Sequence, residues 1–156
     1  MILKNIKWLL LLAFLPILTA CSWEDLPSYE GADITACKIY YRWPSNEYKD
    51  DVTGEPLILD MEMSTSFAID DEAGTVDIQV TVPNAQSYFT NEVRSQVSQN
   101  NLCCQVTLSP AARIAPADGN KVLGVPDDWT IPHKFIVTAA DGTKKEWTIT
   151  VTKFTK

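Results

Sequence analysis

The chain has 156 residues, of which 20 are acidic and 13 are basic, so its formal net charge at neutral pH is −7. Nucleic-acid binding rests on clustered lysine and arginine, and this acidic composition argues against a nucleic-acid partner. The length suits one domain with a single hydrophobic core and a short additional segment.

The first 20 residues, MILKNIKWLLLLAFLPILTA, follow the three-part plan of a secretory signal peptide. Lys4 and Lys7 supply a positive start, and residues 8–18 are apolar with one break at Pro16. The apolar run is shorter than the roughly 20 residues that a membrane-spanning helix needs. We therefore predict a cleaved signal peptide over residues 1–20.

The four residues Leu18, Thr19, Ala20 and Cys21 resemble the lipobox of bacterial lipoproteins. The resemblance implies that diacylglycerol is attached to the Cys21 sulfur, that cleavage precedes Cys21, and that a further fatty acid such as palmitate acylates the new amino terminus. Several acyl chains anchor a protein stably to a membrane that it does not cross. The alternative is an ordinary cleaved signal peptide followed by an incidental cysteine.

The sequence SWED that follows Cys21 resembles the short acidic export tag of surface lipoproteins from Bacteroides-type bacteria. This resemblance implies an outer-membrane protein exposed at the cell surface, whereas the alternative is the solvated start of a linker. Residues 21–32 contain Pro27 and Gly31 and show no sustained periodicity, which predicts a lipidated tether.

From Asp33 onward the hydrophobic pattern has mostly a period of two. Residues 76–82, VDIQVTV, alternate apolar and polar without a break, which predicts a strand with one buried face. Other segments are predicted as strands on similar grounds: residues 34–41, 67–70 and 102–108.

The segment between Pro83 and Leu102 has a different pattern. Phe89, Val93 and Val97 recur at helical spacing, which predicts one short helix or an ordered loop.

The last segment, HKFIVTAADGTKKEWTITVT, predicts a β-hairpin with two conceivable registers. A two-residue turn would place Phe135 opposite Thr148, which sets an apolar side chain against a polar one. A three-residue loop over 140–142 places Phe135 opposite Trp147 and Gly142 in the left-handed conformation that such loops favour. We predict the second register, and the succession of short strands predicts an all-β fold, an antiparallel β-sandwich over residues 33–156 with at most one short helix.

The closing segment FIVTAADGTKKEWTITVT, together with VTLSPAARIAPADG and DIQVTVP, resembles an uncharacterised immunoglobulin-like domain family of Bacteroides-type surface lipoproteins. The resemblance covers residues 33–153 and departs from the family pattern at SYFTNEVRSQVSQNNLCC, which is longer than the usual connection. It implies an immunoglobulin-like sandwich and a surface location, and the family carries no agreed activity.

Three cysteines lie within the predicted domain. Cys37 shares a predicted strand face with Ile39, and Cys104 shares one with Val106, whereas Cys103 faces the other way. This pattern allows a core disulfide between Cys37 and Cys104 in an exported protein, and three buried or free thiols are an equal alternative. The cysteines lack the spacing of a zinc site, and no metal site is predicted.

His133 is the only histidine, so a catalytic triad or a histidine-based metal site would have to include it. It lies on a predicted strand, where a partly buried structural side chain is the simpler interpretation. GxSxG, HExxH and phosphate-binding glycine motifs are absent from the sequence. The acid pairs at 50–51, 70–71 and 127–128 lack EF-hand spacing and are interpreted as solvated turns. We therefore predict neither an enzyme nor a cofactor.

An aromatic cluster is the strongest candidate for a binding site. Trp43, Tyr48 and Trp129 lie near prolines or acidic residues in predicted loops, and exposed aromatic rings beside polar groups suit glycan binding. The alternative is that Tyr41 and Trp43 pack in the core. The sequence thus favours a non-catalytic surface lipoprotein that binds glycan, with a structural or adhesion subunit contacting another surface protein as the second interpretation.

Overall fold

The computed structural model describes residues 29–117 and 119–156. The predicted signal peptide, the lipidation site Cys21 and most of the predicted tether lie outside these residues. The end of the predicted tether contacts the domain: the Tyr29 carbonyl accepts a hydrogen bond from the Ala140 N–H at 3.1 Å, and Ala32 is buried. The contacts of the sandwich with the chain therefore begin ahead of the predicted boundary at Asp33.

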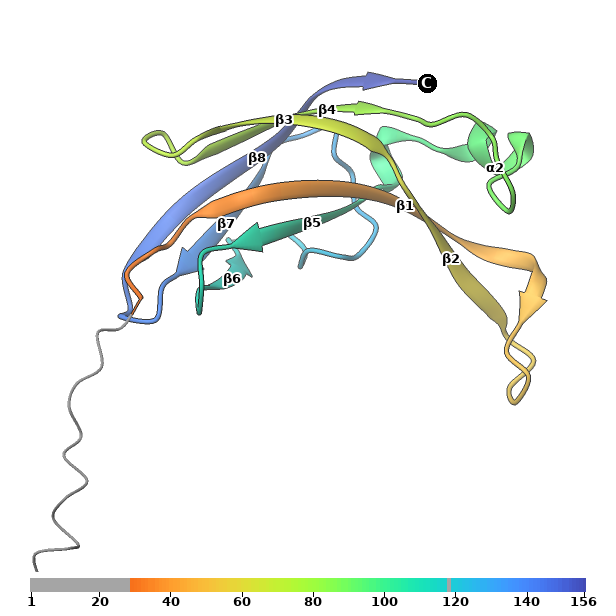
Figure 1. Ribbon diagram of the computed structural model, residues 1–156, viewed down its shortest axis with the longest axis horizontal. Helices are drawn as coiled ribbons and strands as arrows, with labels where there is room; N and C mark the ends of the chain where they lie inside the picture. The colour runs from red at the N-terminus through yellow and green to blue at the C-terminus, as the bar shows by residue number, and fades with distance from the viewer. Residues whose placement is uncertain (1–28, 118) are drawn as a thin grey trace, which may run out of the picture.

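The strands form two sheets, one of three strands in the order β2-β1-β5 and one of five strands in the order β3-β4-β8-β7-β6 (Figure 1). The elements in chain order are β1 (Ile34–Lys49), β2 (Pro56–Glu62), β3 (Ser64–Asp70), β4 (Thr75–Thr81), the helix α2 (Asn91–Gln96), the 3-10 turn η2 (Gln99–Asn101), β5 (Cys103–Leu108), β6 (Arg113–Pro116), β7 (His133–Thr138) and β8 (Lys144–Thr155). The all-β sandwich with one short helix is confirmed for the described residues.

One strand pair departs from the antiparallel expectation. β4 and β8 run parallel, with Ile78 opposite Val151, so the five-stranded sheet is mixed. A parallel pair needs a long crossover connection, and here α2, β5, β6 and β7 all lie between the two strands in the chain. The pair joins the first half of the domain to its last strand.

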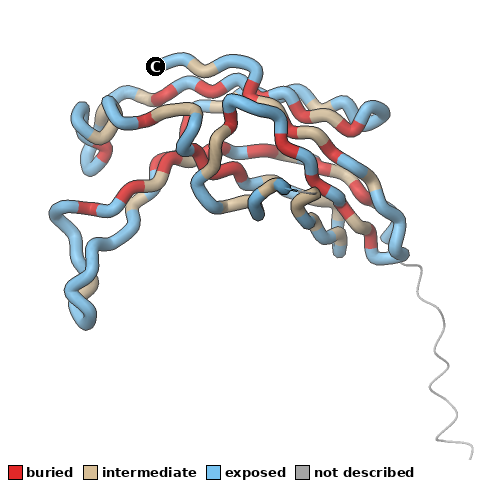
Figure 2. The backbone as a smooth tube through the Cα atoms, turned by 180° about the vertical axis from the view of Figure 1, so that it is seen from behind, coloured by how far each residue is buried: buried red, intermediate tan, exposed pale blue. Residues whose placement is uncertain are grey.

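The predicted alternation along β4 is confirmed. Val76, Ile78 and Val80 are buried, whereas Asp77 and Gln79 are exposed, because successive side chains of a strand point to opposite faces. Figure 2 shows the same alternation of buried and exposed positions along the backbone of the sandwich. The core therefore lies between the two sheets.

The predicted register of the last hairpin is also confirmed. Phe135 lies opposite Trp147, and Gly142 has a φ of 92° in the loop that joins β7 to β8. Trp147 is fully buried, and its indole N–H donates to the Ala32 carbonyl at 2.9 Å. The end of the tether is thereby fixed to the core.

β1 and β2 extend beyond the sandwich as a ribbon (Figure 1). At its tip the Asp50 carboxylate accepts hydrogen bonds from the Val52 and Thr53 N–H groups at 3.0 and 2.7 Å, an arrangement typical of an Asx turn. At the other end of β2, the N–H of the buried Met63 donates to the Ile39 carbonyl at 2.8 Å, and the chain passes into β3 of the second sheet. The same chain segment thus joins the two layers.

The short helix predicted between Pro83 and Leu102 is present, but it is shorter than the spacing of Phe89, Val93 and Val97 suggests. α2 has six residues and begins after Thr90, whose hydroxyl oxygen accepts the Val93 N–H at 3.3 Å as an N-cap. Phe89 and Val97, which flank α2, are buried in the core. Within residues 29–117 and 119–156, no helix has the length and apolar character to cross a membrane.

Candidate functional site

A cleft of about 430 Å³ lies at the end of the sandwich that carries α2 and the β1–β2 ribbon. Its walls are residues 43–48 of β1, Leu59 of β2, and side chains from the segment 87–96. Binding pockets for small ligands commonly enclose about 300–1,000 Å³. The cleft is therefore large enough for a small ligand, and both of its walls can be traced to local features of the sequence.

An irregular stretch of β1 forms the first wall. Between Pro44, which pairs with Ile58, and Lys49, which pairs with Pro56, the ladder shifts register. The buried Ser45 hydroxyl accepts hydrogen bonds from the Glu47 and Tyr48 N–H groups at 3.1 and 2.8 Å. These bonds replace ladder hydrogen bonds and hold the bulged backbone in one shape.

A tight turn forms the second wall. Gln86 and Phe89 exchange backbone hydrogen bonds of 2.9 and 2.8 Å, so Ser87 and Tyr88 form a two-residue turn. Ser87 has a φ of 44°, a conformation that non-glycine residues adopt at a cost and that clusters at functional sites. The turn buries Phe89 and leaves Tyr88 at the surface, with 46% of its residue area exposed.

The exposed ring that the prediction assumed for Trp43 is contradicted by the structure. Trp43 is 7% exposed, because Tyr41 stacks against it at 5.8 Å, Tyr88 at 6.1 Å, and Phe89 packs against it at 5.7 Å between ring centroids. Trp43 still lines the cleft, but its aromatic contacts leave little of the ring exposed for a ligand. Tyr48, which was also predicted, is 48% exposed and lines the cleft.

Tyr88 is the exposed ring that the sequence analysis does not identify. Its neighbour Phe89 carries the helical spacing that marks the core, and the adjacent aromatic ring faces away from that core. The sequence signal is the adjacent pair Tyr88-Phe89: with Phe89 assigned to the core by its spacing, the neighbouring ring is expected to face another way. The exposed aromatic pair of the cleft is therefore Tyr48 and Tyr88.

Polar side chains complete the cleft: Ser45, Asn46, Glu47, Ser87, Thr90, Glu92 and Gln96. The amides donate and accept hydrogen bonds, the hydroxyls do both, and the carboxylates accept them. Glu47 and Glu92 are the charged members, and both are exposed. The combination offers two partly exposed aromatic rings beside many hydrogen-bonding groups.

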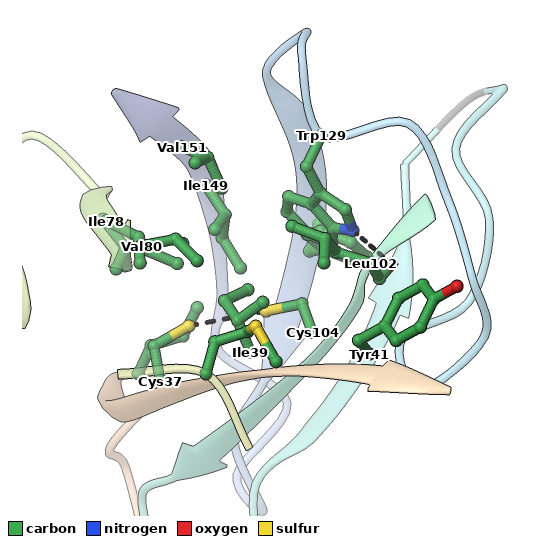
Figure 3. Packing of buried hydrophobic residues seen from close by; sticks show 14 of the residues in the cluster. Cys37, Ile39, Tyr41, Ile78, Val80, Leu102, Cys104, Trp129, Ile149 and Val151 are labelled. Atoms are coloured by element: carbon green, nitrogen blue, oxygen red, sulfur yellow. Dashed lines mark hydrogen bonds between the residues drawn. The ribbon is translucent and has the colours of Figure 1, made fainter. Parts of the chain in front are cut away.

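The predicted role of Trp129 in this platform is wrong as well. Trp129 is 3% exposed, its indole N–H donates to the Leu102 carbonyl at 2.9 Å, and it does not line the cleft (Figure 3). Its ring packs 4.5 Å from the His133 ring. The loop that carries Trp129 folds back onto the core, so this indole closes the sandwich.

His133 is buried beside this indole. Its Nε2 lies 2.7 Å from the Asp128 carbonyl oxygen, which can only accept, so Nε2 carries the proton of that bond. The Asp127 carboxylate lies 3.7 Å from Nδ1 and pairs with Lys121 at 2.9 Å. Burial acts to raise the pKa of Asp127, but the hydrogen bonds from Lys121 and the Asp128 N–H outweigh it and lower that pKa. His133 does not line the cleft.

Cys37 on β1 and Cys104 on β5 belong to the core between the two sheets. The Cys37 and Cys104 sulfurs are 3.5 Å apart (Figure 3). Cys103, on the opposite face of β5, is also buried. The contact with Cys37 and burial raise the pKa of the Cys104 thiol. The structure holds all three as free thiols, and the disulfide stays a prediction.

The sequence matches a family model described as DUF5018-related over residues 34–150. The chain belongs to the DUF5018-related family. A crystal structure of a Bacteroides fragilis protein inferred to be secreted superimposes on this DUF5018-related chain with a TM-score of 0.75 and 44% sequence identity, covering 83% of this chain and 100% of that one. No curated protein matches the sequence. Neither match describes a lipid anchor or an immunoglobulin-like domain, so those parts of the resemblance stay predictions.

Proposed function

We propose that this DUF5018-related chain is a lipid-anchored protein of the outer membrane, exposed at the cell surface, whose sandwich is a non-catalytic glycan-binding module. The observation that carries the proposal is the cleft between Tyr48 and Tyr88, two aromatic residues that are each almost half exposed. Sugar rings present C–H faces that pack on aromatic rings, while neighbouring polar groups bind their hydroxyls.

The position of the cleft supports this function. Tyr29, the first described residue, contacts Ala140 in the β7–β8 loop, whereas α2 and the β1–β2 ribbon lie at the opposite end of the molecule (Figure 1). Cys21 precedes Tyr29 by only eight positions in the sequence. An anchor at Cys21 would therefore hold the far end, with its cleft, away from the membrane. The inferred secretion of the Bacteroides fragilis relative is consistent with this location.

The non-catalytic part of the proposal rests on the side chains available. His133 is buried with its Nε2 committed to a backbone carbonyl, and it lies outside the cleft. Glu47 and Glu92 are both exposed, whereas the general acid of a glycosidase is usually held in an apolar setting. A binding role requires none of that machinery.

One observation favours the structural or adhesion role as a second candidate. The β1–β2 ribbon exposes apolar side chains near its tip, with Val52 93% and Ile58 65% exposed. Contiguous exposed apolar side chains commonly mark protein–protein contacts. A surface protein partner would bind through this ribbon, and Val52→Asp, at a position that does not line the cleft, would then weaken its binding.

The test is binding of the purified domain, residues 21–156, to a glycan array, followed by titration calorimetry with each glycan that binds. Replacing Tyr48 or Tyr88 by alanine should weaken binding about tenfold or more, because each loses a stacking surface. Tyr29→Ala is the matched control, since this exposed tyrosine contacts the β7–β8 loop and does not line the cleft. Absence of glycan binding by the wild type would contradict the proposal and put the adhesion role first. Glycan hydrolysis would contradict its non-catalytic part.

A further inference from the structure

We infer that the cleft selects uncharged sugars and excludes anionic ones such as uronic acids and sulfated sugars. This inference rests on the proposed glycan-binding function. Glu47 and Glu92 are the charged side chains of the cleft, and neither lysine nor arginine occurs among the described residues that line it. A ligand in the cleft therefore meets negative charge without a compensating positive group.

Three basic residues near the cleft walls, Arg42, Arg94 and Lys156, donate to backbone carbonyls of residues that do not line the cleft. Arg42 donates to the Gly124 carbonyl at 2.6 Å, and Arg94 donates through Nε to the Pro83 carbonyl at 2.8 Å. Lys156, which reaches the end of α2, donates to the Val97 carbonyl at 2.9 Å. Lys49 follows Tyr48 on β1 and is not a lining residue. Among the described residues that line the cleft, there is thus no arginine or lysine to bind the anionic group of a sugar.

The chemistry of the lining suits neutral sugars. Ionised carboxylates only accept hydrogen bonds, and the hydroxyl groups of a sugar can donate them. Asn46 and Gln96 supply amide donors for the sugar oxygens. A carboxylate or sulfate on the sugar would instead share the cleft with the negative charges of Glu47 and Glu92, and like charges repel each other. The net charge of −7 adds a weaker repulsion at longer range.

The experiment compares each neutral oligosaccharide that binds on the array with its counterpart in which a primary hydroxyl is oxidised to a carboxylate. Affinities for the wild type are measured by titration calorimetry at low and at high salt. We expect the oxidised sugar to bind about tenfold more weakly at low salt, with a smaller difference at high salt, where mobile ions screen the repulsion.

The double variant Glu47→Gln/Glu92→Gln keeps the side-chain size and removes both charges. It should narrow the difference between neutral and oxidised sugars, whereas Glu30→Gln/Glu72→Gln, which changes the same net charge at exposed positions outside the cleft, should not. Equal or tighter binding of the oxidised sugar by the wild type would overturn the inference and leave the glycan-binding proposal standing. An unchanged difference in the Glu47/Glu92 variant would also overturn it. If no sugar of either kind binds, the proposed function itself fails.

Discussion

Tyr88 stacks on Trp43, with their ring centroids 6.1 Å apart and their planes inclined by 27°. The contact joins β1 to the turn that precedes α2, and it buries the indole while the phenol stays almost half exposed. Trp43 therefore packs in the core, and Tyr88 forms part of the surface. This division of roles distinguishes the effects of mutations at the two positions.

Trp43→Ala should lower the free energy of unfolding by about 3–5 kcal/mol, because it removes a buried ring that contacts three aromatic neighbours. Tyr88→Ala should cost about 1 kcal/mol or less, as expected for an exposed side chain. Urea denaturation of both variants measures the difference. A Trp43 variant as stable as the Tyr88 variant would contradict the assignment of Trp43 to the core.

Trp147→Ala should likewise cost about 3–5 kcal/mol, because Trp147 is fully buried opposite Phe135. Trp147→Phe, which retains most of the apolar ring and loses the indole N–H bond to the Ala32 carbonyl, should cost less. Chemical denaturation again provides the measurement. A loss below about 1 kcal/mol in the alanine variant would place the ring at the surface and disprove the register.

Gly74→Ala should destabilise the protein more than Gly54→Ala. Both glycines have positive φ, 64° and 73°, so alanine pays about 1–2 kcal/mol of backbone strain at either position. At Gly74 the added methyl would also collide with the Glu146 carbonyl oxygen, whereas at Gly54 no atom lies within 4 Å. Equal melting temperatures for the two variants would show that the collision with the Glu146 carbonyl oxygen does not add to the loss of stability at Gly74.

Cys37 and Cys104 should form a disulfide when the protein is exported. The two thiols lose two hydrogens as a disulfide of an envelope thiol–disulfide oxidoreductase is reduced. Mass spectrometry of protein alkylated in denaturant without reductant should find one alkylated cysteine in the domain, at Cys103. Cys103→Ser should retain the disulfide, and Cys37→Ser should leave Cys104 open to alkylation. Three alkylated cysteines in the wild type would rule the disulfide out.

Cys21→Ser should abolish lipid attachment, because the serine oxygen cannot take the place of the sulfur that the lipobox chemistry requires. Metabolic labelling of the expressing bacterium with a radioactive fatty acid gives the readout, with Ser22→Ala as a control that should still take up label. Label on the Cys21→Ser product would refute the lipobox interpretation.

The alternation of residues 76–82 and the hairpin register were predictable from the sequence, because both depend on short-range geometry. Side chains alternate across a strand, and the length of a loop determines which residues face each other. The burial of Trp43 follows the same rule, since it shares the parity of Ile39 and Tyr41, which are also buried. The predicted strand ends at Tyr41, whereas β1 continues through Trp43 to Lys49 and places this ring on the buried face.

The cleft and the fate of Trp129 were decided by the tertiary structure. Tyr48 and Tyr88 lie on separate segments that meet only when the turn at Ser87 folds against the bulged end of β1. Trp129 is buried because its loop returns to β5, where Leu102 and Asp127 form an isolated bridge. The parallel pairing of β4 with β8 likewise depends on everything folded between them. Local patterns determine which face of a strand is apolar, but the contacts that cover or expose a side chain come from residues distant in the chain, and these form only as the whole domain packs.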